Sequence, residues 1–205
     1  MSRPWLVIAL VAAVVAPASA LAQDGVYGRL RGDLVLSVEV LGGASSRAAG
    51  MHAIGSVAVR ARYLDMTGVA LGYDRSFGGE RHDALWAAVD FRPVFLARFA
   101  YDLARGPRWL DLMLDSIGVE LGAAWIRPGE ALQNGGGFGL VVGTGVELPL
   151  AWSNGRGLTL RLAARWIDAP AYNAQGTGAS DGAFEFGGGL VLRTITRAGL
   201  VGAHD

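Results

Sequence analysis

The sequence predicts an all-β protein, an eight-stranded antiparallel up-and-down transmembrane β-barrel, and three observations lead there. Of its 205 residues, 52% are hydrophobic, yet after the first 22 residues no apolar run is long enough for a membrane-spanning helix. Instead, apolar and polar residues alternate in eight segments, most of them about as long as a tilted strand that crosses a bilayer. Glycine occupies 31 positions, many of them on the polar faces, where a narrow closed lumen needs small residues.

Charge and cysteine content exclude several classes of protein. The chain has 18 basic residues, all of them arginine, and 18 acidic residues, so its formal charge is zero. This balance gives no electrostatic footprint for nucleic acid, and we expect no nucleic-acid partner. The absence of cysteine excludes a disulfide framework and a thiolate metal site. The high apolar content excludes a disordered chain.

The first 22 residues have the organisation of a secretory signal peptide. Arg3 precedes the apolar stretch Trp5–Ala16, Pro17 ends that stretch, and small residues lead to a cleavage site after Ala22. Cleavage after Ala20 is the alternative, and a retained signal anchor is the rival interpretation. We therefore expect three parts: the signal peptide (1–22), the barrel (23–193) and a short C-terminal tail (194–205).

The first four alternating segments are 33–42, 56–65, 68–74 and 84–101. In each, apolar residues occupy one face, and charged or small residues occupy the other, which is the period of a half-buried strand. The apolar faces carry Leu34, Leu36, Val38 and Val40; Val57, Val59, Ala61 and Tyr63; Val69, Leu71 and Tyr73; and Leu85, Val89, Phe91, Phe95 and Phe99.

The last four segments are 117–125, 138–148, 158–166 and 184–193. Their polar faces combine charged residues with many glycines, whereas a water-facing sheet surface disfavours glycine. The apolar faces carry Ile117, Val119, Leu121 and Trp125; Phe138, Leu140, Val142, Val146 and Leu148; Leu158, Leu160, Leu162 and Trp166; and Phe184, Phe186, Leu190 and Leu192.

The connections alternate in length, as they do in outer-membrane barrels with long outer loops and short periplasmic turns. The expected outer loops are Gly43–Gly55, Arg75–Asp83, Arg127–Gly137 and Asp168–Gly182, and the expected inner turns are Asp65–Thr67, Asp102–Ser116 and Ser153–Arg156. The middle turn is unusually long, and three structures remain open for it. They are a short helix after Pro107 with Asp111 and Asp115 facing outward, an extension of the fifth strand through a bulge, or a further strand. We expect it to cover the barrel floor, with docking of a periplasmic partner as the alternative.

Charged residues on the polar faces are nearly balanced, with seven arginines and six carboxylates. Because an eight-stranded barrel is only wide enough for its own side chains, we expect these charges to form buried ion pairs that close the interior. A narrow ion path is the alternative, although a selective pore favours an excess of one sign. The expected network is Glu39, Arg60, Arg62, Asp74, Asp90, Arg92, Arg98, Glu120, Glu147, Arg161, Arg165, Glu185 and Arg193.

Aromatic residues gather near the ends of the apolar faces, where the two girdles of a membrane barrel lie at the lipid–water interfaces. Aromatic residues that fill the ends of a soluble core are the alternative. The expected outer girdle is Tyr73, Trp125, Phe138, Trp166 and Phe184, and the expected inner girdle is Tyr63, Phe99, Tyr101 and Trp152.

The final segment carries the pattern of a C-terminal assembly signal: polar, any, glycine, two of any, apolar, any, apolar. Here the pattern is filled by Glu185, Gly187, Leu190 and Leu192. The chain thus resembles the small eight-stranded outer-membrane β-barrel superfamily of Gram-negative bacteria, with the architecture of OmpA-like membrane domains. The resemblance is architectural and extends over nearly all of the mature chain. It departs from the family in the tail that follows the last strand. It implies location in the outer membrane, contact with lipid and lipopolysaccharide, insertion by the barrel-assembly machinery and a monomeric state.

Candidate catalytic and metal-binding groups are few, and we expect no cofactor and no metal. The histidines His52 and His82 fall in the first two expected outer loops, where Ser45, Ser76 and Asp83 also lie. Exposed loop residues of this kind are usually only solvated. We therefore expect a structural or surface-interaction role rather than an enzyme. The alternatives are a lipid-modifying outer-membrane enzyme and a soluble periplasmic barrel that binds an apolar ligand.

Overall fold

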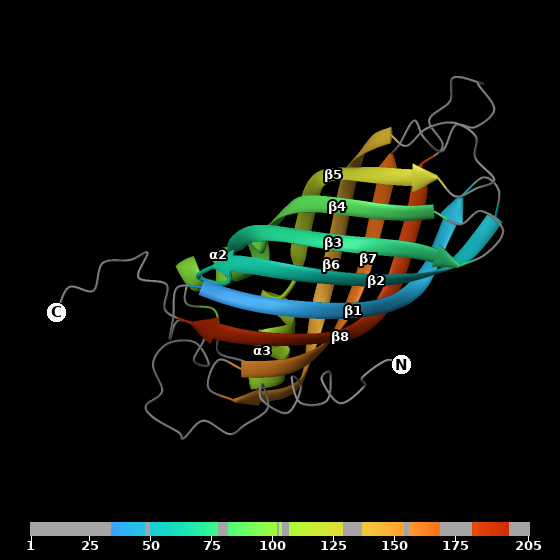
Figure 1. Cartoon of the computed structure of the whole chain (residues 1–205). Helices are drawn as coiled ribbons and strands as arrows, with labels where there is room; N and C mark the ends of the chain where they lie inside the picture. Colours follow the sequence, from blue (N-terminus) through green and yellow to red (C-terminus); the bar gives the residue numbers. More distant parts are fainter. Residues whose placement is uncertain are drawn as a thin grey trace.

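The computed structural model describes residues 34–47, 50–77, 82–101, 103, 107–128, 137–153, 156–168 and 182–196. Eight strands form a closed barrel in which each strand pairs antiparallel with the next and the last pairs with the first (Figure 1). This confirms the predicted all-β, eight-stranded closed antiparallel barrel. The predicted signal peptide lies outside the described residues. The strands are β1 (Leu34–Arg47), β2 (Gly50–Tyr63), β3 (Thr67–Phe77), β4 (His82–Phe91), β5 (Gly118–Pro128), β6 (Gly137–Ser153), β7 (Arg156–Asp168) and β8 (Ala183–Thr196).

Side chains alternate between the interior and the exterior along every strand, as the pleat requires. In β1, for example, Ser37 and Glu39 are buried, whereas Val38 and Val40, which follow them in turn, are exposed. The polar face of each segment therefore turns inward and the apolar face turns outward. A soluble barrel that carries an apolar ligand needs the opposite arrangement, so this alternative is wrong.

Seven of the eight strands are longer than the alternation predicts. β1 and β2 pair as far as Arg47 and Gly50, so most of the predicted first outer loop is strand. His52 accordingly lies within β2, and the predicted loop position for it is wrong. The last strand continues to Thr196, so it includes the first three residues assigned to the tail.

The fourth strand ends at Phe91, and two helices follow: α2 (Pro93–Ala100) and α3 (Arg108–Asp115). The prediction of one long strand over 84–101 is therefore wrong. Pro93 explains the change, because proline has no N–H for a strand ladder and its fixed φ suits the first turn of a helix. For the connection before β5, the helix after Pro107 is the correct alternative. None of the helices in the described part of the chain is long and apolar enough to cross a membrane.

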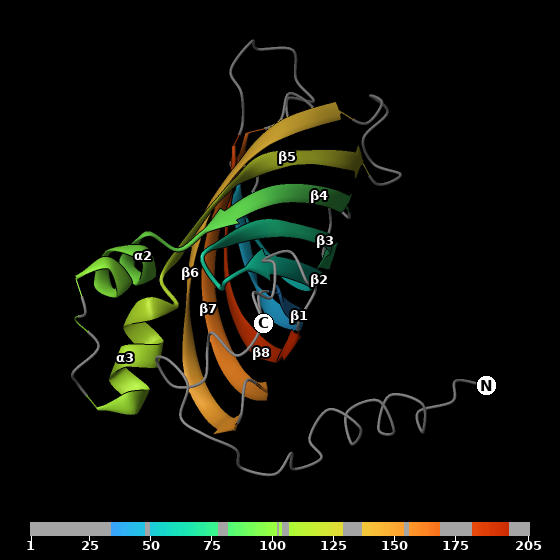
Figure 2. The same ribbon diagram turned by 90° about the vertical axis from the view of Figure 1, so that its left-hand side faces the viewer.

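The two helices lie outside the strand ring, beside β6 (Figure 2). β5 pairs with β6 only as far as Gly145, and β6 continues to Ser153, so its inner half has a free edge towards β5. Ser116, just after α3, lies on this edge and accepts a hydrogen bond from the Glu147 backbone N–H at 2.7 Å. The segment therefore covers a strand edge, and the expectation that it covers the barrel floor is wrong.

The turn between β2 and β3 is a tight turn with two residues in the left-handed region. Leu64 and Asp65 have φ angles of 49° and 58°, and the Met66 N–H donates to the Tyr63 carbonyl at 3.0 Å. Two consecutive left-handed residues are typical of the type I′ turn, whose twist suits a hairpin. This conformation is unfavourable for leucine. It leaves the Asp65 side chain fully buried at the inner end of the barrel.

Candidate functional site

The interior of the barrel is a charged site to which each of the eight strands contributes at least one charged side chain. Inward positions of the strands, the β2–β3 turn and the residue between β4 and α2 place six arginines and seven carboxylates in the buried region. All have almost no exposed surface in the described part of the chain. The arginines are Arg60, Arg62, Arg92, Arg161, Arg165 and Arg193, and the carboxylates are Glu39, Asp65, Asp74, Asp90, Glu120, Glu147 and Glu185.

The middle of the interior is organised around Arg60 on β2. Its guanidinium lies 2.8 Å from Glu39, 3.0 Å from Asp90 and 2.7 Å from Glu120. These carboxylates come from β1, β4 and β5, so one side chain connects four strands across the lumen. Arg161 on β7 adds contacts with Glu120 at 2.5 Å and with Glu39 at 3.5 Å.

The inner end is organised around Glu147 on β6, which contacts four arginines. The shortest distances from its carboxylate are 2.7 Å to Arg92, 3.3 Å to Arg193, 3.4 Å to Arg161 and 3.5 Å to Arg62. A planar guanidinium suits this arrangement because several donors can reach carboxylate oxygens at once.

Asp65 completes the inner end from the β2–β3 turn. Its carboxylate lies 3.0 Å from Arg92 and 2.7 Å from Arg193. These are two of the arginines that also contact Glu147. The turn thereby closes the inner end of the network with a carboxylate held in place by the backbone conformation of the turn.

The outer end is organised around Arg165 on β7. It lies 2.9 Å from Asp74, 3.6 Å from Glu120 and 3.9 Å from Glu185. Its guanidinium also stacks over the buried Trp86 ring, 4.0 Å from the ring centroid, in cation–π geometry. Since Glu120 also binds Arg60 and Arg161, the ion pairs form one continuous network from Asp74 to Asp65.

Trp86 fits into the narrow lumen because Gly72 lies opposite it on β3. A Cβ atom added to Gly72 would lie 2.2 Å from the Trp86 ring, so even an alanine there would force the ring to move. Around Trp86, buried alanines and the side chains of Ile126, Val141 and Ile167 form an apolar cluster in the interior.

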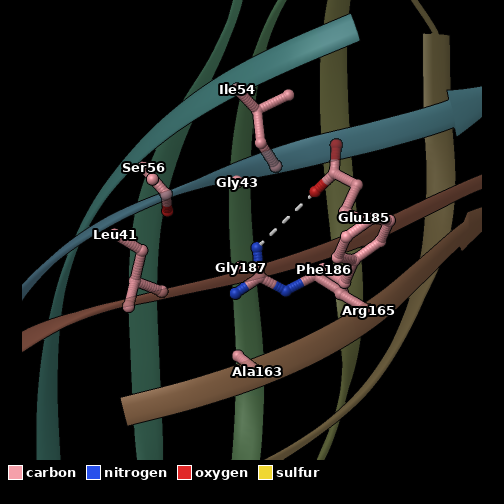
Figure 3. A pocket seen from close by; sticks show the side chains of 10 residues that line it. Leu41, Gly43, Ile54, Ser56, Ala163, Arg165, Glu185, Phe186 and Gly187 are labelled. Atoms are coloured by element: carbon pink, nitrogen blue, oxygen red, sulfur yellow. Dashed lines mark ion pairs between the residues drawn. The ribbon is translucent and has the colours of Figure 1, made fainter. Parts of the chain in front are cut away.

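A recess lies between β7, β8, β1 and β2 in the outer half of the barrel (Figure 3). Its volume is about 300 Å³, including space that is open to solvent. Arg165 and Glu185 face each other in it, and Ser56, Leu41 and Ile54 line its other side. The recess therefore lies next to the outer group of ion pairs and does not form a path around them.

The structure changes the predicted charge set at two positions. Arg98 is not in the lumen: it lies on α2 and pairs with Asp111 and Asp115 of α3, because the strand that was expected to carry it ends at Phe91. Asp111 and Asp115 are consequently buried, and their predicted outward orientation is wrong. Asp65 takes part instead, and the alternation gives no indication of this because Asp65 lies in a turn.

Trp86 is a further interior residue that the sequence analysis did not include. It shares the polar face of its segment with Asp90, so its inward orientation follows from position alone. The signal in the sequence that could have identified it is a large aromatic residue on a face otherwise occupied by small and charged residues.

The exterior of the barrel presents exposed apolar side chains from all eight strands. No charged side chain interrupts the middle of this band among the described residues. The band is formed by Leu36, Val38, Val40, Val57, Val59, Val69, Leu71, Leu85, Val89, Val119, Leu121, Leu140, Val142, Leu162, Phe186 and Leu190. An apolar exterior around a charged interior is the arrangement of a barrel that crosses a lipid bilayer.

The predicted outer aromatic residues lie on the exterior near the outer ends of their strands. Trp125 pairs in register with Phe138, and Trp166 pairs with Phe184. Tyr73 reaches the same row through Leu85. All five of these aromatic side chains are exposed.

The predicted inner aromatic residues are placed differently. Tyr63 ends β2, but Phe99 lies on α2 and Tyr101 follows it, so their predicted strand positions are wrong. Trp152 lies near the end of β6, and its side chain is outside the described part.

Among the candidate catalytic residues whose side chains are described, none forms part of an accessible site. Ser45 lies opposite His52 in the β1–β2 register, but its side chain has 0% exposed surface. Ser76 is also buried, and Asp83 pairs at 3.9 Å with Arg75 at the outer rim. His82 begins β4, so its predicted loop position is wrong, and its side chain lies outside the described residues. Among the described residues, no cluster of three or more potential metal-ligating side chains is present.

The residues of the assembly pattern lie on β8, as its position in the sequence requires. Glu185 faces inward and is buried, Gly187 lines the recess, and Leu190 faces outward. Gly189, in the same run, is crowded by β1: an added Cβ would lie 2.0 Å from the Val40 carbonyl oxygen. The seam between the last and first strands therefore requires glycine at this point.

The closed topology, the charged interior and the apolar exterior together define a small eight-stranded β-barrel of the membrane-spanning class. In fold, the chain matches small outer-membrane barrels of known structure. No protein-family model matches the chain. No curated protein matches its sequence.

Three solved structures illustrate this likeness, which concerns the fold alone. Neisserial surface protein A aligns at 12% identity and a TM-score of 0.46, over 78% of this chain and 96% of that one. The N-terminal β-barrel domain of Pseudomonas aeruginosa OprF aligns at 11% identity and a TM-score of 0.48, over 79% and 98%. The outer membrane enzyme PagL aligns at 13% identity and a TM-score of 0.41, over 78% and 99%.

Proposed function

We propose that the protein is a structural outer-membrane barrel whose interior does not conduct ions. The observation that carries this proposal is the continuous ion-pair network from Asp74 at the outer end to Asp65 at the inner end. Each buried charge contacts at least one of opposite sign, so the interior is a packed polar core. A conducting path needs mobile water along the axis and favours an excess of one sign.

Ion transfer through this core would require the network to open. Separating one partner from a buried ion pair leaves an uncompensated charge, which costs about 3–5 kcal/mol. Glu147 alone would have to release four arginines. The side chains therefore favour a closed interior over a narrow ion path.

The location in the outer membrane is part of the same proposal. It is supported by the exterior apolar band and by the signal-peptide pattern at residues 1–22. The assembly pattern on β8 indicates insertion by the barrel-assembly machinery. The lipid-facing band indicates contact with lipid and lipopolysaccharide. Because all strands pair within one chain, we propose that the protein is a monomer.

An enzymatic role is less well supported by the geometry. A nucleophile must reach its substrate, and Ser45 and Ser76 are both buried within the barrel. We therefore propose a structural or surface-interaction role rather than lipid modification. We expect His52→Ala to leave the lipid composition of the membrane unchanged. A change in lipid composition that depends on His52 would favour the alternative of a lipid-modifying enzyme.

Two measurements test the proposed function. Membrane fractionation with a heat-modifiable gel shift should find the protein folded in the outer membrane; soluble periplasmic protein without a shift would contradict this location. Planar-bilayer recording of the refolded protein should then show no regular current steps. Steady steps from wild-type protein, with a conductance that changes when Arg165 is replaced by alanine, would show that the interior is an ion path.

A further inference from the structure

We propose that the α2–α3 segment is a lipid anchor that lies in the headgroup–acyl boundary of the periplasmic-side leaflet. The inference rests on the proposed membrane location of the barrel and adds a second, helical contact with lipid. Its basis is the distribution of side chains on the two helices and their position beside the strand wall.

The segment has the opposite distribution of charged and apolar side chains from a helical pair in water. Its described charged side chains face each other between the helices: Arg98 pairs with Asp111 and lies 2.8 Å from Asp115. Both aspartates have almost no exposed surface. A helical pair in water places such residues on the outside and its apolar residues inside.

Among the described residues of the segment, the exposed side chains are largely apolar. Tyr101 is 75% exposed, Trp109 is 59% exposed and Leu103 is 52% exposed, and Leu96 and Phe99 are also exposed. Only Phe95 and Leu112 among its large apolar side chains are fully buried. Tryptophan and tyrosine favour the boundary between headgroups and acyl chains because one end of each ring system is apolar and the other is polar.

The position of the segment favours lipid as the occupant of this surface. It connects the inner ends of β4 and β5, and Val89 and Val119 near those ends face outward in the apolar band. It lies beside β6 and outside the ring, where Leu150 is also exposed (Figure 2). The apolar surface of the segment is thus a continuation of the lipid-facing exterior. Interfacial helices of this kind bury their apolar face about 5–10 Å into the boundary.

The absence of cysteine from the chain allows a direct depth measurement. Single-cysteine variants Leu103→Cys and Trp109→Cys would be labelled with a fluorophore and refolded into phosphatidylethanolamine–phosphatidylglycerol vesicles. The vesicles would contain phosphatidylcholine with a nitroxide quencher near the headgroup or near the chain end. Leu190→Cys on the apolar band is the lipid control. Arg156→Cys, at the exposed first residue of β7 at the same end of the barrel, is the water control.

We expect the labels at 103 and 109 to lose most fluorescence with the shallow quencher and less with the deep one. The label at 190 should respond more to the deep quencher, and the label at 156 should respond to neither. Unquenched labels at 103 and 109, with quenching retained at 190, would overturn the lipid anchor and leave the surface free for a protein partner. Loss of quenching at 190 in folded protein would instead overturn the proposed membrane location. A heat-modifiable gel shift verifies folding of each variant.

Discussion

Replacing Glu147 with glutamine removes the carboxylate at the centre of the inner network while keeping its shape. Four arginines contact this group, at distances between 2.7 and 3.5 Å. A pair of unit charges about 4 Å apart interacts with about 4 kcal/mol at an effective dielectric constant of about 20. Much of this attraction is offset by the desolvation of the charges. The variant, however, leaves the arginines buried with one carboxylate fewer. We therefore expect a loss of about 3–5 kcal/mol in the free energy of unfolding.

The assay is equilibrium urea unfolding in lipid vesicles, followed by tryptophan fluorescence and by the heat-modifiable gel shift. Asp83→Asn is the matched control, because Asp83 pairs with Arg75 at 3.9 Å and the two side chains are 39% and 53% exposed. An exposed pair contributes about 0–1 kcal/mol. If Glu147→Gln lowers the free energy of unfolding no more than this control does, the network does not stabilise the barrel and the reasoning is refuted.

Three further predictions concern the exterior, the lumen packing and the turn, and each is measured by the same unfolding assay. Leu71→Arg on the lipid face should cost about 2–4 kcal/mol, whereas Met51→Arg near the outer end of β2 should cost about 0–1 kcal/mol; equal costs would contradict the assigned lipid face. Gly72→Ala should cost about 1–3 kcal/mol through overpacking against Trp86, and this cost should fall in a Trp86→Leu background; purely additive effects would show that the two residues are not in contact. Leu64→Asn should stabilise the protein by about 0.5–1 kcal/mol, because asparagine tolerates a φ of 49° better than leucine; a destabilised variant would argue against the left-handed turn.

The strand pattern was predictable because the two faces of a barrel wall lie in different environments. Lipid on one side and a narrow lumen on the other force every second residue to change character, and this leaves a period of two in the sequence. The arginines and carboxylates of the strands were visible for the same reason. Val38 and Glu39, adjacent in the chain, illustrate both sides of one wall.

The connections were less predictable because their conformation depends on single residues and on distant contacts. Pro93 ends the fourth strand, although Phe95 and Phe99 continue an apolar alternation that also fits one face of a helix. Asp65 enters the lumen through the backbone conformation of its turn, which no periodicity records. Arg98 was assigned to the wrong environment because its partners on α3 are brought to it only by the folded chain.

The seam between β1 and β8 has a consequence for how the chain folds. Leu34 pairs with Thr196, so closure joins the two ends of the described sequence. Such non-local pairing is slow to form. Until β8 arrives, β1 and β7 each present a row of unpaired amides and carbonyls, which hydrocarbon does not tolerate. The first seven strands alone are therefore not stable in the bilayer. Insertion must be coupled to the pairing of β8 with β1 and β7.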